Sequence, residues 1–384
     1  MANPCNNYIH NAYVNHYINF IIRIVIYYIA HWDWILKNSR SDIAKVVDFD
    51  VTGVAPLKDF KNDLKEDFVE TIDWDYNRKK LLHVRGVFNL RKLLRTFNNN
   101  DIIHIFTLKS LFLYLFASIF FKKDFKAIAS ITGLGYLFAN TVLAKLIKFI
   151  LQPFVRISIN SKIDTLIFQN TKNMEDFTKF ANFLGSCEII EGSGLNIESI
   201  ELKTSVNKKL KIIFAGRFLK EKGYFEYLEI INKLTGNENF DFYIAGDIDP
   251  GNKSSISSDD LKELKSNPSL TYLGIIDIKS ELWKYDILIL PSYHEGFSRI
   301  LLEAAYVGLF CIVNDLPGTE TIIKKTNCGK LILGNKVQDY IDELLSLQDS
   351  FPYLDNINIR KNIENEYSVK AIAKKMSNLY KEYV

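Results

Sequence analysis

The sequence predicts an α/β protein built from two doubly wound domains, each with a parallel sheet covered by helices on both faces. Short apolar runs typical of buried strands alternate with longer segments of helical periodicity, and this alternation occurs twice along the chain. The length of 384 residues exceeds the size at which a single core stops growing, so two domains are expected. With 48% hydrophobic and 24% charged residues, the composition is that of a globular protein.

The first half of the chain supplies the first series of elements. Its expected strands are short and apolar: Ile21–Ile29, Val46–Phe49, Phe68–Ile72, Ile102–Phe106, Ala127–Ile131 and Thr165–Gln169. The segments between them that repeat apolar residues every three or four positions are expected to be helices: Val84–Phe97, Leu111–Phe121, Leu137–Val155 and Met174–Leu184. Because strands alternate with helices, right-handed crossovers between parallel strands follow.

The second half repeats this pattern after a polar stretch, Gly192–Lys209. Its expected strands are Lys211–Ala215, Asp241–Ala245, Leu270–Leu273, Asp286–Leu290 and Phe310–Val313. Its expected helices are Gly223–Leu234, Ser258–Lys265, Ile278–Trp283 and Ser298–Val307. A lone amphipathic helix, Ser368–Tyr383, either packs on its own domain or crosses back to the first. We therefore predict a first domain over residues 1–195, a second over 196–365 and a C-terminal helix over 366–384.

The charge is distributed unevenly. The whole chain carries a net charge of only +3. Residues 76–162, however, contain fifteen Lys or Arg and only two acidic residues, Asp101 and Asp124. Such asymmetry indicates an anionic partner for the first half of the chain.

The cysteines, the histidines and the apolar runs limit the classes of protein and of site. The four cysteines include no CxxC pair, which favours a reducing cytoplasm over a disulfide scaffold or a zinc ribbon. The six histidines show no metal-binding spacing, so no metal site is expected. No apolar run reaches the roughly 20 residues of a membrane span, and no signal peptide is indicated.

The first candidate site follows the strand Lys211–Ala215. The turn Gly216–Gly223 carries Arg217 and Lys222 directly before a helix. In an open parallel sheet, ligands bind at the carboxyl ends of the strands. Two cations beside a helix N-terminus form a good clamp for a diphosphate, because a guanidinium, an ammonium and the helix dipole act together. The alternative is a solvated basic turn, and this segment alone does not decide between the two.

The second candidate site follows the strand Asp286–Leu290. Glu295 lies in the turn, and the backbone amides of Gly296, Phe297 and Ser298 form an anion-binding nest, with Ser298 as the expected helix cap. Glu303 lies in an apolar helix, where a carboxylate needs a partner. On one helix the two carboxylates would stand about 12 Å apart, beyond the roughly 5–9.5 Å of a hydrolytic pair. They therefore have different tasks.

These residues together resemble a known family. Gly-Arg-x4-Lys-Gly at 216–223 followed by Glu295-x7-Glu303 is similar to the retaining GT-B glycosyltransferases of family 4, in which two Rossmann-like domains face a central cleft. In the first half, the motifs Ile131–Tyr136, Ile167–Asn170 and Gly192–Leu195 resemble the branch that builds bacterial surface polysaccharides and lipid-linked oligosaccharides.

The resemblance implies a role for each matching residue. Arg217 and Lys222, on the turn that Gly216 opens, would hold the diphosphate of a nucleotide-sugar donor. Glu295 would contact the transferred sugar near the reacting carbon, and Glu303 would bind the ribose. The remaining donor contacts would be backbone groups at Gly296, Phe297 and Ser298, Ile275 against the nucleobase, and the first-domain loop with Gly133 and Gly135. The resemblance further implies a hexosyltransferase that needs no metal or cofactor and acts with retention on a saccharide acceptor linked to polyprenyl diphosphate.

The chain departs from the family pattern at several points, two of them in its first half. Many relatives have a histidine where this chain has Thr132, which puts histidine assistance at that point in doubt. The glycine-rich turn common after the first strand is replaced by His31–Trp34. Those two tryptophans either face the acceptor or simply pack against the strand end.

Other functions remain as alternatives. A sugar-nucleotide 2-epimerase would use the same diphosphate clamp, whereas a non-catalytic sugar-binding protein would need none. A nucleic-acid binder is disfavoured, because the basic residues are interleaved with Leu- and Phe-rich helical patterns and with no nucleic-acid motif. We instead expect residues 76–162 to dock on anionic lipid at the inner face of the cytoplasmic membrane, with Lys109, Lys122, Lys123, Lys145 and Lys148 around the apolar runs.

Overall fold

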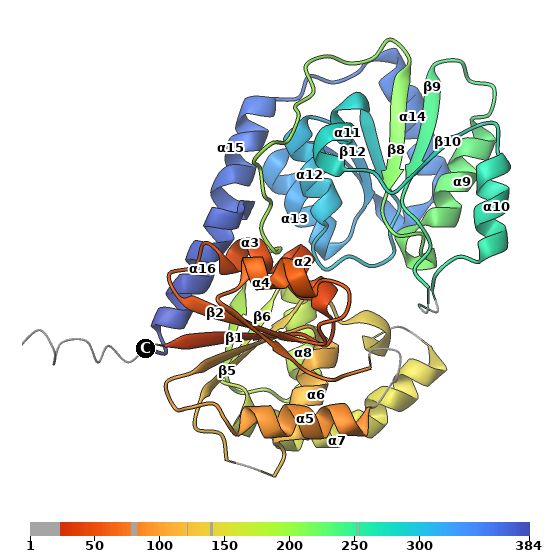
Figure 1. Cartoon of the computed structure of the whole chain (residues 1–384). Coiled ribbons are helices and arrows are strands. Elements are labelled where there is room, and N and C mark those ends of the chain that lie inside the picture. The colour runs from red at the N-terminus through yellow and green to blue at the C-terminus, as the bar shows by residue number, and fades with distance from the viewer. Residues whose placement is uncertain (1–23, 78–82, 121, 139–140, 251, 253) are drawn as a thin grey trace, which may run out of the picture.

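Two parallel β-sheets form the framework of the protein (Figure 1). The computed structural model describes residues 24–384 except 78–82, 121, 139–140, 251 and 253. The strand order of the seven-stranded first sheet is β3-β2-β1-β4-β5-β6-β7, and that of the six-stranded second sheet is β10-β9-β8-β11-β12-β13. This arrangement confirms the predicted pair of doubly wound sheets.

The strands lie close to the expected segments. Those of the first sheet are β1 (Val25–Ile29), β2 (Asp50–Ala55), β3 (Glu70–Asp73), β4 (Ile102–Phe106), β5 (Lys126–Ile131), β6 (Thr165–Phe168) and β7 (Ser186–Ile189). Those of the second sheet are β8 (Leu210–Ala215), β9 (Phe240–Ala245), β10 (Thr271–Gly274), β11 (Ile287–Leu290), β12 (Phe310–Asn314) and β13 (Gly329–Ile332). The start of the expected strand Ile21–Ile29 lies outside the described residues.

Helices cover both faces of the first sheet. One face packs against α5 (Val84–Leu94), α6 (Leu108–Ser118), α7 (Val142–Lys162) and α8 (Thr171–Ala181), with the short 3-10 helix η2 (Gly135–Phe138) before α7. The other face packs against α2 (Asp33–Ser39), α3 (Ser41–Ala44), α4 (Lys61–Asp67) and α16 (Val369–Lys381). The buried side chains of these helices and of the strands between them form the first core.

A separate hydrophobic core surrounds the second sheet. Its helices are α9 (Tyr224–Lys233), α10 (Ser258–Ser266), α11 (Ile278–Glu281), α12 (Arg299–Val307), α13 (Pro317–Thr326), α14 (Val337–Asp349) and α15 (Asn356–Tyr367), with the 3-10 turns η3 (Lys220–Lys222), η4 (Leu282–Lys284) and η5 (Leu333–Asn335). Within the part of the chain that the structure describes, no helix is both long and apolar enough to span a bilayer.

One expected strand, Val46–Phe49, is wrong. These residues form the turn after α3, where the Asp48 backbone N–H donates to Ser377 Oγ on α16 at 3.2 Å. The strand is instead Asp50–Ala55. Its sequence pattern predicts a strand only weakly, because it contains Gly53. The Phe68 ring packs closely over this glycine, because a Cβ at Gly53 would lie only 3.2 Å from the ring.

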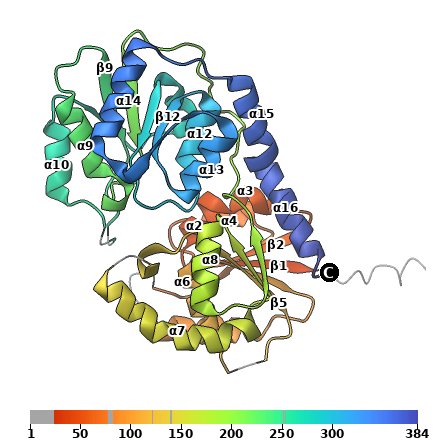
Figure 2. The same ribbon diagram turned by 180° about the vertical axis from the view of Figure 1, so that it is seen from behind.

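The C-terminal helix crosses back to the first sheet (Figures 1 and 2). The chain passes between the two sheets near Leu195 and again near Ser368, and the two crossings are hydrogen-bonded to each other. Beyond Ser368, the apolar face of α16 joins the first core. There the Tyr380 hydroxyl lies 2.6 Å from His104 Nδ1 and donates to the Tyr28 hydroxyl at 3.0 Å. The carboxyl-terminal segment therefore ties the two halves of the chain together.

Candidate functional site

The two candidate turns of the second sheet lie side by side, because β8 and β11 are neighbouring parallel strands. Lys222 Nζ, at the end of the first turn, donates to Glu295 Oε1 in the second at 2.7 Å. The hydroxyl of Ser292 donates to the same oxygen at 3.0 Å. The Glu295 side chain is 6% exposed and that of Lys222 is 24% exposed. The structure thus joins two residues, 73 positions apart, that the sequence analysis assigned to different tasks.

Gly223 allows the close approach of these turns. Its φ of +78° lies in the left-handed region, and a side chain here would collide with the carbonyl of Pro291 at the end of β11. The backbone N–H of Tyr293 also donates to the Glu221 carbonyl at 2.9 Å. These backbone contacts fix the positions of Lys222 and Glu295 relative to each other.

Arg217, the other predicted cation, is paired with Asp249 on the loop after β9. Its Nη1 donates to Asp249 Oδ2 at 2.7 Å, and more than half of the arginine side chain is exposed. The sequence analysis expected both cations to hold a diphosphate at this edge. In the structure, Arg217 and Lys222 each bind a carboxylate, so an anionic ligand would have to replace Asp249 and Glu295.

The turn after β11 leads into α12. Ser298 occupies the N-cap position as expected, but its side chain makes no capping hydrogen bond, so that part of the prediction is wrong. The ring of Phe297 packs against the ring of Tyr367, with 5.2 Å between the centroids, and contacts Gly192. The Phe297 side chain therefore anchors the turn against both crossings of the chain, which leaves its backbone to serve a ligand.

Glu303 has a partner that the sequence analysis missed. Arg299, one helical turn earlier, donates from Nε to Glu303 Oε1 at 2.9 Å. The same arginine donates from Nη1 to the carbonyl of Asn38, at the end of α2, at 2.8 Å. Burial raises the pKa of the Glu303 carboxyl, and the charge of Arg299 opposes that effect. The i, i+4 spacing could have revealed this pair; the contact with the first sheet could not be read from sequence.

The carboxyl edges of the two sheets meet at Gly296. A side chain here would collide with the carbonyl of Thr132, which follows β5 in the first sheet. The Gly296 carbonyl accepts from Asn170 Nδ2 at 2.8 Å. Gly133 and Gly135, next along the chain from Thr132, face open space, since a side chain at either would meet nothing within 4 Å. The predicted first-domain loop therefore lies beside the Glu295 turn.

Two other predicted residues lie at the edge of the second sheet. Gly216 follows β8, and a side chain there would also meet nothing within 4 Å. Ile275 follows β10 and is 83% exposed. Both are therefore accessible from solvent, as residues that contact a ligand must be.

The first sheet has a strained residue where its strand order reverses, between β1 and β4. Thr107, after β4, has φ +80° and ψ +152°, a conformation that β-branched residues rarely adopt. Its hydroxyl lies 3.2 Å from Nδ1 of His31, which follows β1 and also contacts Ser110. The crevice at such a reversal is where open α/β sheets bind ligands. No sequence signal pointed to Thr107.

The segment His31–Trp34 is held by a buried carboxylate. Asp33 Oδ2 accepts from the backbone N–H groups of Lys58, Asp59 and Phe60 at 2.7–3.1 Å. The rings of Trp32 and Trp34 stack on each other, with 5.1 Å between centroids. Asp33 therefore has a structural role. The two tryptophans pack together next to His31, which contacts Thr107 and Ser110.

Comparison with known proteins identifies the family. Residues 197–380 match the family described as Glycosyl transferases group 1, and residues 25–170 match the one described as Glycosyl transferase 4-like. The chain belongs to the GT-B glycosyltransferases. Among solved structures, sucrose-phosphate synthase from Thermosynechococcus elongatus resembles this glycosyltransferase with a TM-score of 0.74 and 16% identity, covering 94% of this chain and 98% of that one. Anabaena HepE in complex with UDP gives a TM-score of 0.72 at 16% identity, covering 94% and 100%.

Two curated glycosyltransferases with named reactions are also similar. The N,N'-diacetylbacillosaminyl-diphospho-undecaprenol alpha-1,3-N-acetylgalactosaminyltransferase of Campylobacter jejuni is 26% identical over 371 residues, which cover 90% of this chain and 92% of that protein. The UDP-Gal:alpha-D-GlcNAc-diphosphoundecaprenol alpha-1,3-galactosyltransferase of Escherichia coli is 31% identical over 109 residues, 28% of each chain. By their names, both act on saccharides linked to undecaprenyl diphosphate.

Proposed function

We propose that this glycosyltransferase moves a sugar from a nucleotide-diphosphate sugar to a saccharide linked to polyprenyl diphosphate, with retention, in the biosynthesis of a bacterial surface polysaccharide. The observation that carries the proposal is the pair of turns at the carboxyl edge of the second sheet. They join Lys222 to the Glu295 carboxylate beside the first-sheet loop, and Arg217 lies on the same turn as Lys222, paired with Asp249. The named reactions of the Campylobacter and Escherichia relatives support the class of acceptor.

In this proposal the donor lies across the second sheet. Its diphosphate replaces Asp249 on Arg217 and Glu295 on Lys222, which releases the Glu295 carboxylate towards the sugar. The backbone amides of Gly296, Phe297 and Ser298 add dipoles at the same edge. Glu303 accepts the ribose hydroxyls, and Ile275 lies against the base. Gly133 and Gly135 allow the phosphates to approach the first domain.

The transfer exchanges one bond at the anomeric carbon. The bond between that carbon and the diphosphate oxygen breaks, and its electron pair leaves with the nucleoside diphosphate. The acceptor hydroxyl forms the new bond on the same face, and its proton passes to the departing phosphate oxygen. Arg217 and Lys222 stabilise the charge that develops on the leaving group, and each donor of this kind is worth about 3–4 kcal/mol.

A panel of activated sugars tests this function. Purified protein is incubated with UDP- and GDP-sugars and a lipid-linked acceptor, and the released nucleotide is measured. We expect one donor to be turned over and the variants Arg217→Ala and Lys222→Ala to lose that turnover. Unchanged turnover in both variants would refute the assignment. Donor incubated without acceptor separates the alternatives, because an epimerised sugar nucleotide indicates the 2-epimerase, and binding without any reaction indicates a sugar-binding protein.

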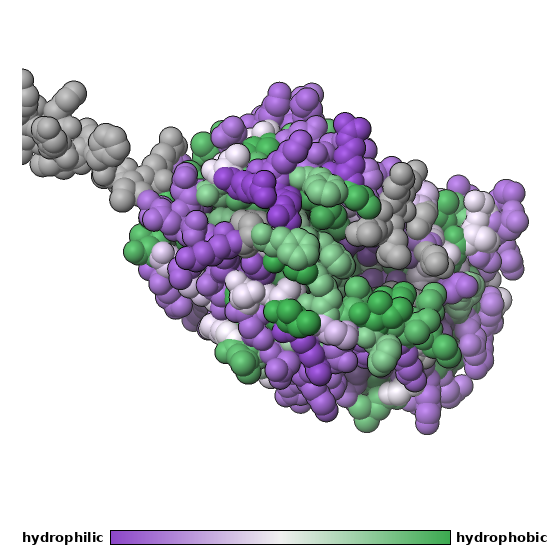
Figure 3. All heavy atoms as spheres, turned by 90° about the horizontal axis from the view of Figure 1, so that it is seen from below, coloured by the Kyte–Doolittle hydropathy of each residue, from purple (hydrophilic) through white to green (hydrophobic). Residues whose placement is uncertain are grey.

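We also propose that the first domain docks on anionic lipid at the inner face of the cytoplasmic membrane, where such acceptors are held. The docking surface we infer is the outer face of α7, where Val142, Leu143, Leu146, Phe149, Ile150 and Ile157 are exposed (Figure 3). This helix contains no acidic residue, and Lys145 and Lys148 lie among its apolar side chains. An apolar helix face accompanied by lysines suits the surface of an anionic bilayer.

The structure corrects the residues expected at that surface. Most side chains of the apolar run Leu111–Phe121 are buried in the first core and cannot meet a membrane. Lys123 is also unsuitable, because it is largely buried and paired with Asp164. Lys109 lies over the ring of Tyr76. The outward apolar face belongs to α7 and not to α6.

Vesicle co-sedimentation tests the docking surface. We expect the protein to sediment with phosphatidylglycerol vesicles at low salt, and less with phosphatidylcholine vesicles or at high salt. The double variant Phe149→Gln, Ile150→Gln should lose this binding. Ile357→Gln is the matched control, since Ile357 is as exposed on α15 of the second domain. If the sedimented fraction of the protein does not change with lipid charge or with salt concentration, the docking proposal is refuted.

A further inference from the structure

Arg40 is a buried arginine with no counter-ion. It lies between α2 and α3, is 3% exposed, and stacks its guanidinium over the Phe106 ring at 4.4 Å from the centroid. Its Nε and Nη1 atoms are buried and have no hydrogen-bond partner. Among the residues that the structure describes, no carboxylate forms an ion pair with it. Because an uncompensated buried cation costs several kcal/mol, its presence needs an explanation.

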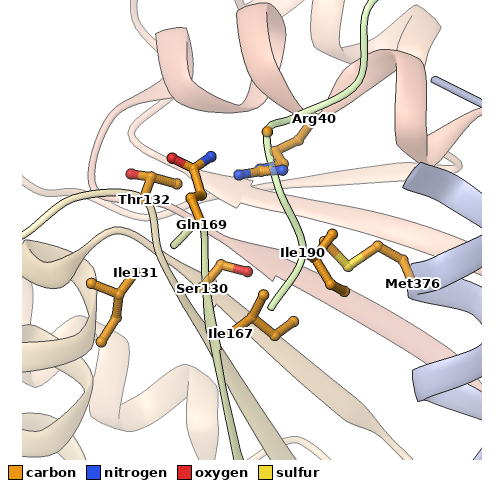
Figure 4. A pocket seen from close by; sticks show the side chains of 9 residues that line it. Arg40, Ser130, Ile131, Thr132, Ile167, Gln169, Ile190 and Met376 are labelled. Carbon is orange, nitrogen blue, oxygen red and sulfur yellow. The ribbon is translucent and has the colours of Figure 1, made fainter. Parts of the chain in front are cut away.

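The guanidinium points into a small pocket at the carboxyl edge of the first sheet (Figure 4). Polar groups on one side come from Ser130, Thr132 and Gln169, which follow or end β5 and β6. The remaining lining is Ile131, Ile167, Ile190, Gly192 and Met376. The pocket has room for about one water-sized group, so it admits an oxygen atom of a ligand but not a sugar ring.

The neighbouring ionisable groups do not neutralise Arg40. Burial lowers the pKa of Arg40 to about 10, so the guanidinium stays charged at neutral pH. The closest titratable groups are the hydroxyls of Tyr28 and Tyr380, whose pKa values burial raises, so both remain neutral. His104, behind them, is also neutral, because burial lowers its pKa well below the usual value. The described residues around Arg40 therefore supply no negative charge, and a ligand could supply it.

The pocket adjoins the turn that is proposed to hold the transferred sugar. Thr132 lines the pocket, and its carbonyl meets the backbone of Gly296, next to Glu295. Gln169, also in the lining, reaches the same glycine with its side-chain oxygen, which lies 3.0 Å from where a Cβ would stand. A group that projects from a sugar held at Glu295 therefore lies next to Arg40.

We propose that Arg40 binds the carboxylate of a hexuronic acid, so that the transferred sugar is a uronate and not a neutral hexose. This inference rests on the proposed function and names its substrate class. One carboxylate oxygen enters the pocket and accepts a hydrogen bond from one of the two unpartnered nitrogens of Arg40, Nε or Nη1. The contact is a charge-assisted hydrogen bond, because the guanidinium and the carboxylate carry opposite charges. The polar side chains of Thr132 and Gln169 complete the contact.

Matched donor pairs test this specificity. Binding and turnover are compared for UDP-glucuronate with UDP-glucose, UDP-galacturonate with UDP-galactose, and GDP-mannuronate with GDP-mannose. We expect one uronate to be preferred about 10- to 100-fold over its neutral partner, the range of a charge-assisted hydrogen bond. Arg40→Gln should bring that ratio close to one and leave the affinity for the free nucleotide unchanged. Arg40→Lys, which keeps the charge but not the fork, should retain part of the preference.

Controls separate specificity from folding. Arg156→Gln removes another first-domain arginine, one that donates to the Lys179 and Phe180 carbonyls on α8, and should leave the ratio unchanged. Arg40→Gln should also unfold at a temperature no lower than the parent, because it removes an unpaired buried charge. A preference for the neutral donor, or a ratio unaffected by Arg40→Gln, would overturn the inference and leave a bound water as the occupant of the pocket. Transfer of a neutral sugar would leave the proposed function standing, whereas absence of binding to every nucleotide and donor would remove both.

Discussion

The ion pair between Lys222 and Glu295 predicts a difference between two substitutions that remove either partner. Lys222→Ala leaves the Glu295 carboxylate buried with a single remaining donor, the Ser292 hydroxyl. Glu295→Ala leaves instead an ammonium that is 24% exposed and can be hydrated. Removing one partner of a buried pair is destabilising because of the charge left behind. The lysine variant should therefore be the less stable of the two.

The magnitudes follow from the exposure of each group. A fully buried pair loses about 3–5 kcal/mol when one partner is removed. With Ser292 still donating, we expect Lys222→Ala to lower the free energy of unfolding by about 2–3 kcal/mol. Glu295→Ala should cost about 1 kcal/mol, close to the mean of point substitutions. The double variant should recover at least about 1 kcal/mol relative to Lys222→Ala, since the buried charge is gone.

Catalysis should respond differently from stability. Lys222→Ala should lower the rate of transfer at saturating donor by about 100-fold or more, because it removes a cation at the leaving diphosphate. The double variant should stay inactive although its stability returns. Lys220→Ala is the matched control, because Lys220 is exposed on the same 3-10 turn, and it should change stability by less than about 0.5 kcal/mol.

Urea denaturation and nucleotide-release assays on the five proteins measure both effects. Equal destabilisation by Lys222→Ala and Glu295→Ala would refute the reasoning from burial. A double variant that regains activity together with stability would show that Lys222 serves only the fold, and the diphosphate clamp would then have to be abandoned.

Three further outcomes follow from other contacts. Burial holds the pKa of His104 below its ordinary value of 6.5. Below that pH the unfolded chain therefore binds a proton that the folded chain does not. As the pH falls, the free energy of unfolding should decrease by about 1.4 kcal/mol per pH unit. His104→Gln should flatten this part of the pH profile of unfolding, and an unchanged profile would contradict the role of His104. Tyr380→Phe removes the hydroxyl that contacts His104 and Tyr28 and should cost about 1–2 kcal/mol in urea denaturation; an unchanged midpoint would contradict the anchoring role of α16. Gly296→Ala places a methyl group against the Thr132 carbonyl and should abolish transfer in the nucleotide-release assay. Gly133→Ala, where a side chain meets nothing within 4 Å, should fold normally in the same preparation. Full activity of the Gly296 variant would show that the carboxyl edges of the two sheets need not meet at this residue.

The sequence by itself determined the architecture and the residues worth testing. Alternating apolar runs and helical periods are local properties of the chain, and they predicted both parallel sheets and most of their strands. The motifs around Arg217 and Glu295 were likewise readable, because a strand followed by a glycine-containing turn and a helix is a local arrangement. The four-residue strands β7 and β13 carried too little signal to be predicted, and the helices α2, α3, α4, α13, α14 and α15 were also not predicted, although α14 buries Tyr340, Ile341, Leu344 and Leu347 at helical spacing.

Only the tertiary structure decided which of these residues meet. Lys222 and Glu295 are 73 positions apart, Arg299 and Asn38 are 261 apart, and His104 and Tyr380 are 276 apart. No local pattern encodes such pairs. They arise when separate elements pack together, and the hydrophobic periodicity of each element does not say which other element it will contact. The same reason applies to Arg40. Its polar sequence neighbours are typical of a surface arginine, and only the packing of helices against the first sheet leaves it buried, without an ion-pair partner among the described residues.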